Sequence, residues 1–403
     1  MGYVRKTPAG SWKACWRDAT GRQPSKTFPT KREAAAFLAT VETARHTGTY
    51  IDPHAGKRMK FGVYAAEWLE SHNVELTTRA RDLSLLRTHL LPQWANAPLS
   101  AIDHSAVQKW VAKLSAHLSP ATVTECHRLF SAVLKAAIRD RLIAINAAAG
   151  VRLPKKRQQA GDRQTISREA FTAQLLPAIP PRHRPLVALA GGTGLRWGEC
   201  IGLRWESIDL NAGTLRVERV AIEVSGHVTP KPYPKSRAGR RVVPLPSMVA
   251  DLLKRHRDLY GTGPAGEVFT NEAGTPLRRT LFRARIWRPA LVRAGLLGAV
   301  TEEGEKFRAT WPTPTGDMSE VFSTAVQAVK AIARHGDGGL RFHDLRHSYA
   351  SWLITSGVPV PDVQRVMGHE RPTTTLAIYT HVQGGSQERV LDALAAFSLP
   401  DEG

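Results

Sequence analysis

The chain has 403 residues, of which 42% are hydrophobic, and its 56 Lys and Arg residues outnumber 35 Asp and Glu, a formal net charge of +21. This length suits two or three domains, each with a core of its own. The composition excludes a low-complexity chain, and the sequence shows neither the apolar run of roughly 20 residues that spans a membrane nor the apolar region of a signal peptide. The three cysteines are far apart, which excludes a disulfide framework or a zinc-ligand cluster. We therefore expect a globular, cytoplasmic protein.

The excess of positive charge indicates a polyanionic partner, and nucleic acid is the first candidate. The charge is dense near the N-terminus, where residues 1–60 contain 12 Lys and Arg against 4 Asp and Glu. A host whose proteins are generally basic would show the same excess without such a partner. Charge by itself therefore identifies no reaction.

Residues 1–46 are expected to form a small three-stranded sheet followed by a helix. Apolar and polar residues alternate over 12–17 with the period of a half-buried strand, and 23–28 would add another strand. Thr30 and Glu33 have the spacing of a capping box, which opens a helix. A basic sheet of this kind could lie in a DNA groove or could be only a solvated surface.

The middle of the chain has the pattern of a helical domain over residues 61–150. It lies between a linker at 47–60 and a basic, apolar-poor linker at 151–164. Apolar residues at helical spacing predict four amphipathic helices, at about 61–72, 77–91, 105–116 and 120–143. In the last of these Cys126 lies on the apolar side, so we interpret it as a core residue and not a nucleophile.

Residues 165–403 form the third unit, which is mainly helical. Helices are expected around 168–176, 182–191, 197–204, 246–259 and 276–293, and a short antiparallel sheet from 214–224 and 227–244. The sequence thus predicts a multidomain α+β protein: a small sheet with a helix, then a helical domain, then a mainly α domain with a small antiparallel sheet.

Familiar cofactor and metal motifs are absent from the sequence. The glycines from Gly192 to Gly198 are spaced one residue too widely for a dinucleotide loop, and Glu267 stands where a phosphate-binding loop needs lysine. His343 and His347 have zinc-ligand spacing, but Asp344 replaces the glutamate of that motif and no third ligand is evident. We expect no nucleotide cofactor and no catalytic metal.

Four segments remain that carry reactive or phosphate-binding side chains. They read TGLRWGE at 193–199, PKSRAGRRVVPL at 234–245, LRFHDLRHSYAS at 340–351 and VMGHERPTTTLAIYTH at 366–381. This combination, in this order, resembles the tyrosine site-specific recombinases of the phage integrase family. The resemblance covers the whole chain in outline and is most specific over 193–205 and 341–381.

Each residue of the motif has a physical task at a phosphodiester. Arg196 and Arg346 carry planar guanidinium groups that match the non-bridging oxygens, where charge develops. His343 lies three residues before Arg346, on the same side of a helix, and can donate to the phosphate or accept the proton of the nucleophile. His369 supplies a further donor. Tyr379 is the expected nucleophile. The resemblance implies that it becomes linked to the 3′ phosphate of the cleaved strand, which leaves a free 5′ hydroxyl on the other fragment.

The departing 5′ oxygen needs a proton, and the resemblance implies a lysine in a β-hairpin turn as its source. Lys231 and Lys235 both satisfy that description. We favour Lys235 because it is closer to the strand at 241–244, which follows this lysine in related sequences. Glu199, one turn beyond Arg196, is expected to orient or neutralise its neighbours.

The resemblance implies a DNA integrase that cleaves and rejoins strands without ATP. Residues 1–46 would bind arm-type DNA, while 61–150 and 165–403 would clamp the crossover site in a homo-tetramer. A host DNA-bending protein and a directionality factor are further expected partners. Alternatives are a cellular resolvase, a type I-B topoisomerase, or a DNA-binding repressor without catalysis, which would leave the motif unused.

Residues 298–338 depart from the family pattern, which passes quickly to the H-x-x-R segment. They contain six acidic and four basic residues, which argues against DNA contact. Phe322, Val326, Val329 and Ala333 predict an amphipathic helix within the insertion. It could be a partner surface, a lid or a tolerated surface elaboration.

Overall fold

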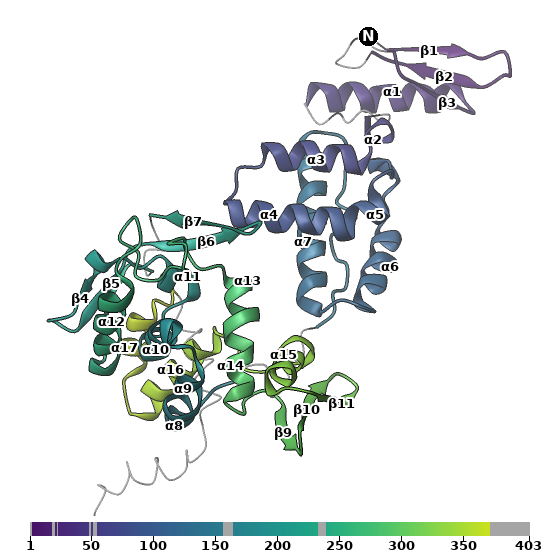
Figure 1. Cartoon of the computed structure of the whole chain (residues 1–403). Helices are drawn as coiled ribbons and strands as arrows, with labels where there is room; N and C mark the ends of the chain where they lie inside the picture. Colours follow the sequence, from purple (N-terminus) through teal and green to yellow (C-terminus); the bar gives the residue numbers. More distant parts are fainter. Residues whose placement is uncertain are drawn as a thin grey trace, which may run out of the picture. The chain divides into compact units, whose positions relative to one another are not determined.

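The computed structural model describes residues 2–17, 21, 23–47, 50, 55–155, 164–232 and 239–370. Two compact units divide the chain, Met1–Gln158 and Gln159–Gly403 (Figure 1). Over the described ranges, no helix has both the length and the apolar character needed to cross a membrane. The predicted mixture of a small N-terminal sheet, a helical middle and a mainly helical C-terminal part is confirmed.

The N-terminal sheet consists of β1 (Tyr3–Lys6), β2 (Trp12–Cys15) and β3 (Ser25–Phe28), paired antiparallel in that order. Helix α1 (Lys31–His46) follows, and the Thr30 side chain accepts a hydrogen bond from the Glu33 amide at 3.3 Å, as its spacing predicts. One side of the sheet is apolar and packs on α1. The buried residues of this small core are Ala14, Trp16, Ala34, Leu38 and Val41.

The helical domain forms because each of its amphipathic segments buries one apolar face in a common core. Its helices are α2 (Ala55–Arg58), α3 (Phe61–Ser71), α4 (Leu76–Leu85), η1 (Leu86–Leu90), α5 (Leu91–Trp94), η2 (Leu99–Ala101), α6 (His104–Ser115) and α7 (Pro120–Arg139). Aromatic rings of Phe61, Trp94, Trp110 and Phe130 meet at its centre. Cys126 is fully buried there, as expected. Helix α7 ends earlier than predicted, because Arg141 adopts a φ of 56°.

The C-terminal unit is built mainly from helices around a larger core. They are α8 (Arg168–Ala170), η3 (Phe171–Leu175), α9 (Leu176–Ala178), η4 (Pro181–His183), α10 (Arg184–Thr193), α11 (Trp197–Ile201), η5 (Trp205–Ser207), α12 (Ser247–Tyr260), α13 (Arg279–Phe282), η7 (Arg283–Trp287), α14 (Arg288–Arg293), α15 (Ala325–His335), α16 (Asp344–Thr355) and α17 (Val360–Met367). Helix α10 is buried on nearly all sides and packs against α12 and α16. It is therefore the central support of this unit.

The strands of this unit correct one prediction. The expected single sheet is two: β4 (Ile208–Asp209), β5 (Thr214–Val217) and β8 (Arg241–Pro244) form one, while β6 (Val220–Val224) and β7 (His227–Lys231) form a separate hairpin. The reason is burial. Strand β5 buries Leu215 and Val217 in the core beside β8, whereas every residue of β6 is only half buried, so the chain leaves the first sheet after Val217.

The insertion is more ordered than the sequence indicated. It contains an antiparallel meander of β9 (Ala299–Glu303), β10 (Lys306–Thr313) and β11 (Gly316–Phe322), followed by α15. The predicted helix is present, but its buried face is made by Ala328, Ile332 and Ala333, while Val326 is 63% exposed. The strands were missed, although buried Ala309 and Trp311 in β10 have the period of a strand.

A buried arginine fixes this insertion to the rest of the unit. Arg288, in α14, donates from Nε to the carbonyl of Ala333 at 2.5 Å, and from its two Nη atoms to the carbonyls of Gly336 and Gly338. The Ala333 carbonyl lies in the last turn of α15, and the carbonyls of Gly336 and Gly338 lie in the segment after it. The insertion is thus anchored to α14 by charge-assisted hydrogen bonds in the interior.

Candidate active site

Arg196 and Glu199 form the first part of the site. Arg196 directly precedes α11, and its amide donates to Glu199 Oε2 at 2.9 Å while its guanidinium donates to Oε1 at 2.8 Å. Glu199 is 3% exposed, whereas the Arg196 side chain is 41% exposed. The buried carboxylate of Glu199 therefore holds the Arg196 guanidinium from the protein interior. The solvent-exposed part of the guanidinium stays accessible to an anion.

Glu199 is shared with a second guanidinium, that of Arg241 at the start of β8. Arg241 Nη2 lies 3.0 Å from Glu199 Oε2. Burial alone would raise the pKa of Glu199, but hydrogen bonding and charge from Arg241, together with Arg196, lower it to about 2. Glu199 is therefore an anion at any pH near neutrality, in agreement with the orienting role expected of it.

Arg346 lies in the first turn of α16 and is 2% exposed. Its Nη1 donates to the Gly194 carbonyl at 2.6 Å and its Nη2 to the Met367 carbonyl. Burial, and after it the charge of Arg196, lowers the pKa of Arg346 to about 9, so the group remains protonated at pH 7. Two of its five N–H groups are used in these bonds, which leaves others for a ligand.

Gly194 explains how the α10 end and α16 can approach so closely. It caps α10 with a φ of 64°. A Cβ at this position would lie 2.5 Å from Cδ1 of Tyr349 and 3.0 Å from Sδ of Met367. Glycine is thus required both by the backbone conformation and by space, and the carbonyl it presents is one that Arg346 binds.

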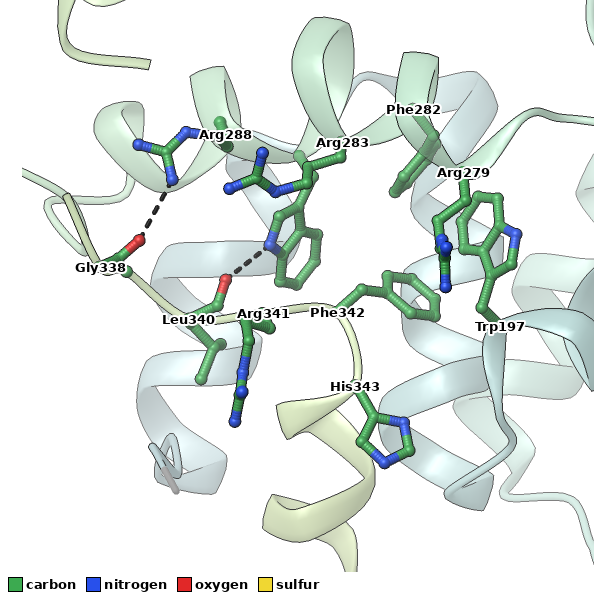
Figure 2. A pocket seen from close by; sticks show the side chains of 12 residues that line it. Trp197, Arg279, Phe282, Arg283, Arg288, Gly338, Leu340, Arg341, Phe342 and His343 are labelled. Carbon is green, nitrogen blue, oxygen red and sulfur yellow. Dashed lines mark hydrogen bonds between the residues drawn. The ribbon is translucent and has the colours of Figure 1, made fainter. Parts of the chain in front are cut away.

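His343 occupies the position before α16, directly after a segment that lines a cavity of about 310 Å³ (Figure 2). Phe342 packs edge-on against Trp197 at 5.1 Å between ring centroids and against Phe282 at 5.8 Å. The indole of Trp287 donates to the Leu340 carbonyl at 2.7 Å. These contacts fix the backbone that carries His343.

His369 follows α17, whose last turn is closed by Gly368 with a φ of 62°. The His369 amide donates to the Gln364 carbonyl at 3.2 Å, and the Gln364 side chain donates back to the His369 carbonyl at 3.2 Å. His369 is 9% exposed. The turn after α17 therefore fixes the backbone at His369.

Both histidines are uncharged at pH 7. Burial, followed by the neighbouring His347 and the charges of Arg346 and Arg196, lowers the pKa of His343 to about 4. Burial and the charges of Arg346 and Arg196 lower the pKa of His369 to about 3. The same arginines act on both rings, so the structure brings four predicted residues, Arg196, His343, Arg346 and His369, into one cationic cluster. Such a cluster favours an anionic ligand.

Two predicted residues, Lys235 and Tyr379, lie outside the described residues. The alternative lysine, Lys231, is the last residue of β7 and pairs with Val220. The sequence reasoning missed Arg241, although it stands at a strand start inside one of the four segments. No sequence signal pointed to it, because its partner Glu199 lies 42 residues away in the chain.

Comparison with known proteins identifies the family. The profile described as "Phage integrase family" matches residues 169–385, and "Phage integrase, N-terminal SAM-like domain" matches residues 60–115. The chain belongs to the phage integrase family. It is a site-specific tyrosine recombinase, as the four segments predicted.

Relatives of this recombinase include a prophage integrase and a tyrosine recombinase. The putative prophage phiRv2 integrase of Mycobacterium tuberculosis is 26% identical over 416 residues, covering 100% of this chain and 97% of that protein. A tyrosine recombinase XerC-like protein of Caldanaerobacter subterraneus is 30% identical over 50% of this chain and 46% of that protein.

Solved structures share the fold of the recombinase. The Tn1549 transposon integrase in complex with transposon right end DNA has a TM-score of 0.60 at 20% identity, covering 84% of this chain and 100% of that one. A lambda integrase dimer bound to a core site has a TM-score of 0.54 at 16% identity, covering 95% of each chain.

Proposed function

We propose that this enzyme is the integrase of a mobile element, which cleaves and rejoins double-stranded DNA through a 3′-phosphotyrosine formed by Tyr379. The observation that supports this most is the convergence of Arg196, His343, Arg346 and His369 from three separate parts of the chain. Arg346 donates to the carbonyls of Gly194 and Met367, which stand two residues before Arg196 and His369, and the charges of Arg196 and Arg346 lower the pKa of both histidines. A repressor without catalysis would have no need of it.

The proposed step is an in-line displacement at phosphorus. The phenol oxygen of Tyr379 forms a bond to the phosphorus, and the bond from phosphorus to the 5′ oxygen breaks. Arg196, Arg346 and the neutral His369 donate to the non-bridging oxygens, where charge accumulates. His343, uncharged at pH 7, accepts the phenol proton, and Lys235 gives a proton to the departing 5′ oxygen.

The reverse reaction restores the DNA without an external energy source. The phosphotyrosine keeps the free energy of the broken phosphodiester, so a 5′ hydroxyl from the same or another duplex can attack it. The proton moves from that hydroxyl back to Lys235, and His343 returns its proton to Tyr379. Attack by a hydroxyl from a second duplex exchanges the strands.

Trapping the covalent intermediate tests this function. A duplex site with a nick just 3′ of the cleaved phosphate loses its short 5′-hydroxyl fragment by diffusion, so the adduct should accumulate. We expect the protein on the 3′ end of the retained strand and no loss of adduct when chelator is added. An adduct on the 5′ end, or strict magnesium dependence, would contradict the proposal.

The role of Lys235 has its own test. When sulfur replaces the 5′ bridging oxygen, the leaving thiolate needs no proton, so cleavage by Lys235→Ala should return to near the wild-type rate. Arg196→Ala should not be rescued in this way, because it removes a phosphate donor and not the acid. Rescue of Lys231→Ala instead would transfer the role to that lysine.

The proposed partners are double-stranded attachment-site DNA and further copies of this chain. A related structure shows a lambda integrase tetramer bound to a Holliday junction, with a TM-score of 0.54 at 17% identity. By analogy, two pairs of protomers would hold the two duplexes during exchange. A host DNA-bending protein and a directionality factor would control the direction of recombination.

The N-terminal sheet would bind arm-type sites apart from the crossover site. Its core is separate from that of the helical domain, and each phosphate contact made by its basic residues would steepen the salt dependence of binding. A chain that starts near Lys57 should still form the adduct at the core site but lose the footprint on distal sites. If the shortened protein protects every site, the resolvase alternative gains support.

A further inference from the structure

Arg241 is a buried charge beside the site that donates four hydrogen bonds within the protein. Its side chain is 4% exposed. Nη2 donates to Glu199 Oε2 at 3.0 Å, Nη1 donates to Glu199 Oε1 at 3.2 Å and to the Gly239 carbonyl at 3.1 Å, and Nε donates to the Val366 carbonyl at 2.7 Å. Of the five N–H groups of an arginine, at least one on each nitrogen is thus bonded within the protein.

Each of these partners either bonds to a residue of the proposed mechanism or stands within four residues of one in the sequence. Glu199 also accepts two hydrogen bonds from Arg196. Val366 lies three residues before His369, in the last turn of α17. Gly239 stands four residues after Lys235 in the sequence.

We propose that Arg241 is a positioning residue that sets the places of Arg196 and His369 relative to each other at the scissile phosphate. Every nitrogen of its guanidinium already donates within the protein, so the role we assign to it is to hold its neighbours and not to bind the phosphate. The inference rests on the proposed function, because it names a determinant of that same site. Catalysis here depends on donors held at hydrogen-bond distance from the phosphate oxygens, about 2.7–3.1 Å, and a displacement of about 1 Å from that position is costly.

The physical reason is the sharing of one carboxylate by two cations. With Arg241 present, Glu199 is neutralised from the interior and holds Arg196 by one edge only. Without Arg241, Arg196 is the one arginine among the described residues that still pairs with the buried carboxylate of Glu199. The Arg196 guanidinium would therefore turn inward, away from the phosphate. The Val366 carbonyl would also lose its donor, which frees the turn before His369.

Single-turnover cleavage of a nicked site tests the proposal. Arg241→Met should reduce the cleavage rate of bound DNA by about 100-fold, the cost of a small misplacement of reacting groups, while the dissociation constant changes no more than in the control. The control is Arg216→Met, on neighbouring strand β5, where the side chain is 60% exposed. A cleavage rate equal to that of Arg216→Met would overturn the proposal.

The pH profile separates positioning from simple loss of structure. In the wild type the pKa of Glu199 is about 2, so Glu199 stays charged from pH 5 to 8. In Arg241→Met the hydrogen bonds and charge of Arg241 no longer offset burial, and only Arg196 remains of the two described arginine partners, so the pKa of Glu199 rises. As the pH falls, Glu199 then takes up a proton and no longer holds Arg196 in a fixed position. We expect the cleavage rate of Arg241→Met to fall toward low pH over a range in which the wild-type rate does not. This fall should disappear in the double variant that also carries Glu199→Gln. A profile parallel to the wild type would contradict the inference.

A measurement without DNA keeps this inference distinct from the proposed function. Arg241→Lys retains the charge but cannot bridge the same partners, so it serves if Arg241→Met does not fold. Hydrogen exchange at the Gly368 and His369 amides should be faster in this variant, with α12 unchanged. Unchanged exchange would overturn the inference. A wild type that never forms an adduct would overturn the proposed function and leave the exchange result to decide the role of Arg241.

Discussion

Replacing Tyr379 by Phe should abolish the covalent protein–DNA adduct and leave DNA binding almost unchanged. The change removes one oxygen atom, the nucleophile, and no charge at neutral pH, because a phenol with a pKa of about 10 is protonated there. The phosphate donors Arg196 and Arg346 remain in place. Adduct formation on nicked sites and mobility-shift titrations with the same DNA measure the two effects.

The matched control is Tyr349→Phe. Tyr349 is a buried tyrosine of α16, 8% exposed, whose pKa is raised by burial. A buried phenol of this kind is a poor nucleophile, so Tyr349→Phe should still form the adduct. If Tyr379→Phe forms the adduct as well as the wild type does, the nucleophile has been assigned wrongly.

Replacing Arg346 by Gln should reduce cleavage by about 100- to 1,000-fold, the usual loss when one donor to a developing oxyanion is removed. The folded protein should also lose about 1–3 kcal/mol of stability, because the buried carbonyls of Gly194 and Met367 lose a charged donor. Single-turnover cleavage and urea unfolding measure these two losses.

Substituting the 5′ bridging oxygen by sulfur should not rescue Arg346→Gln, because the missing function is charge stabilisation and not protonation of the leaving group. Arg365→Gln is a suitable control: it lies in neighbouring helix α17 and its side chain is 78% exposed, paired with Asp362 at the surface. Rescue of Arg346→Gln by sulfur, or equal cleavage by both variants, would contradict the assignment.

The sequence by itself predicted most of the elements outside the insertion and the residues that we propose for the site. Amphipathic periodicity, the cap at Thr30 and the burial of Cys126 depend on neighbours in the same segment, so a local pattern suffices to predict them. The motif residues could be recognised for a similar reason: guanidinium, imidazole and phenol groups in one order are a rare combination, whatever their positions in space.

Only the tertiary structure decided how these groups are held. The bonds of Arg241 to Glu199 and Val366 span 42 and 125 residues of sequence, and no local pattern encodes such contacts. The split of the predicted sheet after Val217 likewise depends on which strand finds space beside the core. The sequence gives the identity of each side chain. Its burial and its charged neighbours arise only when distant segments pack together, and this burial and these charges set the pKa values of Glu199 and His343.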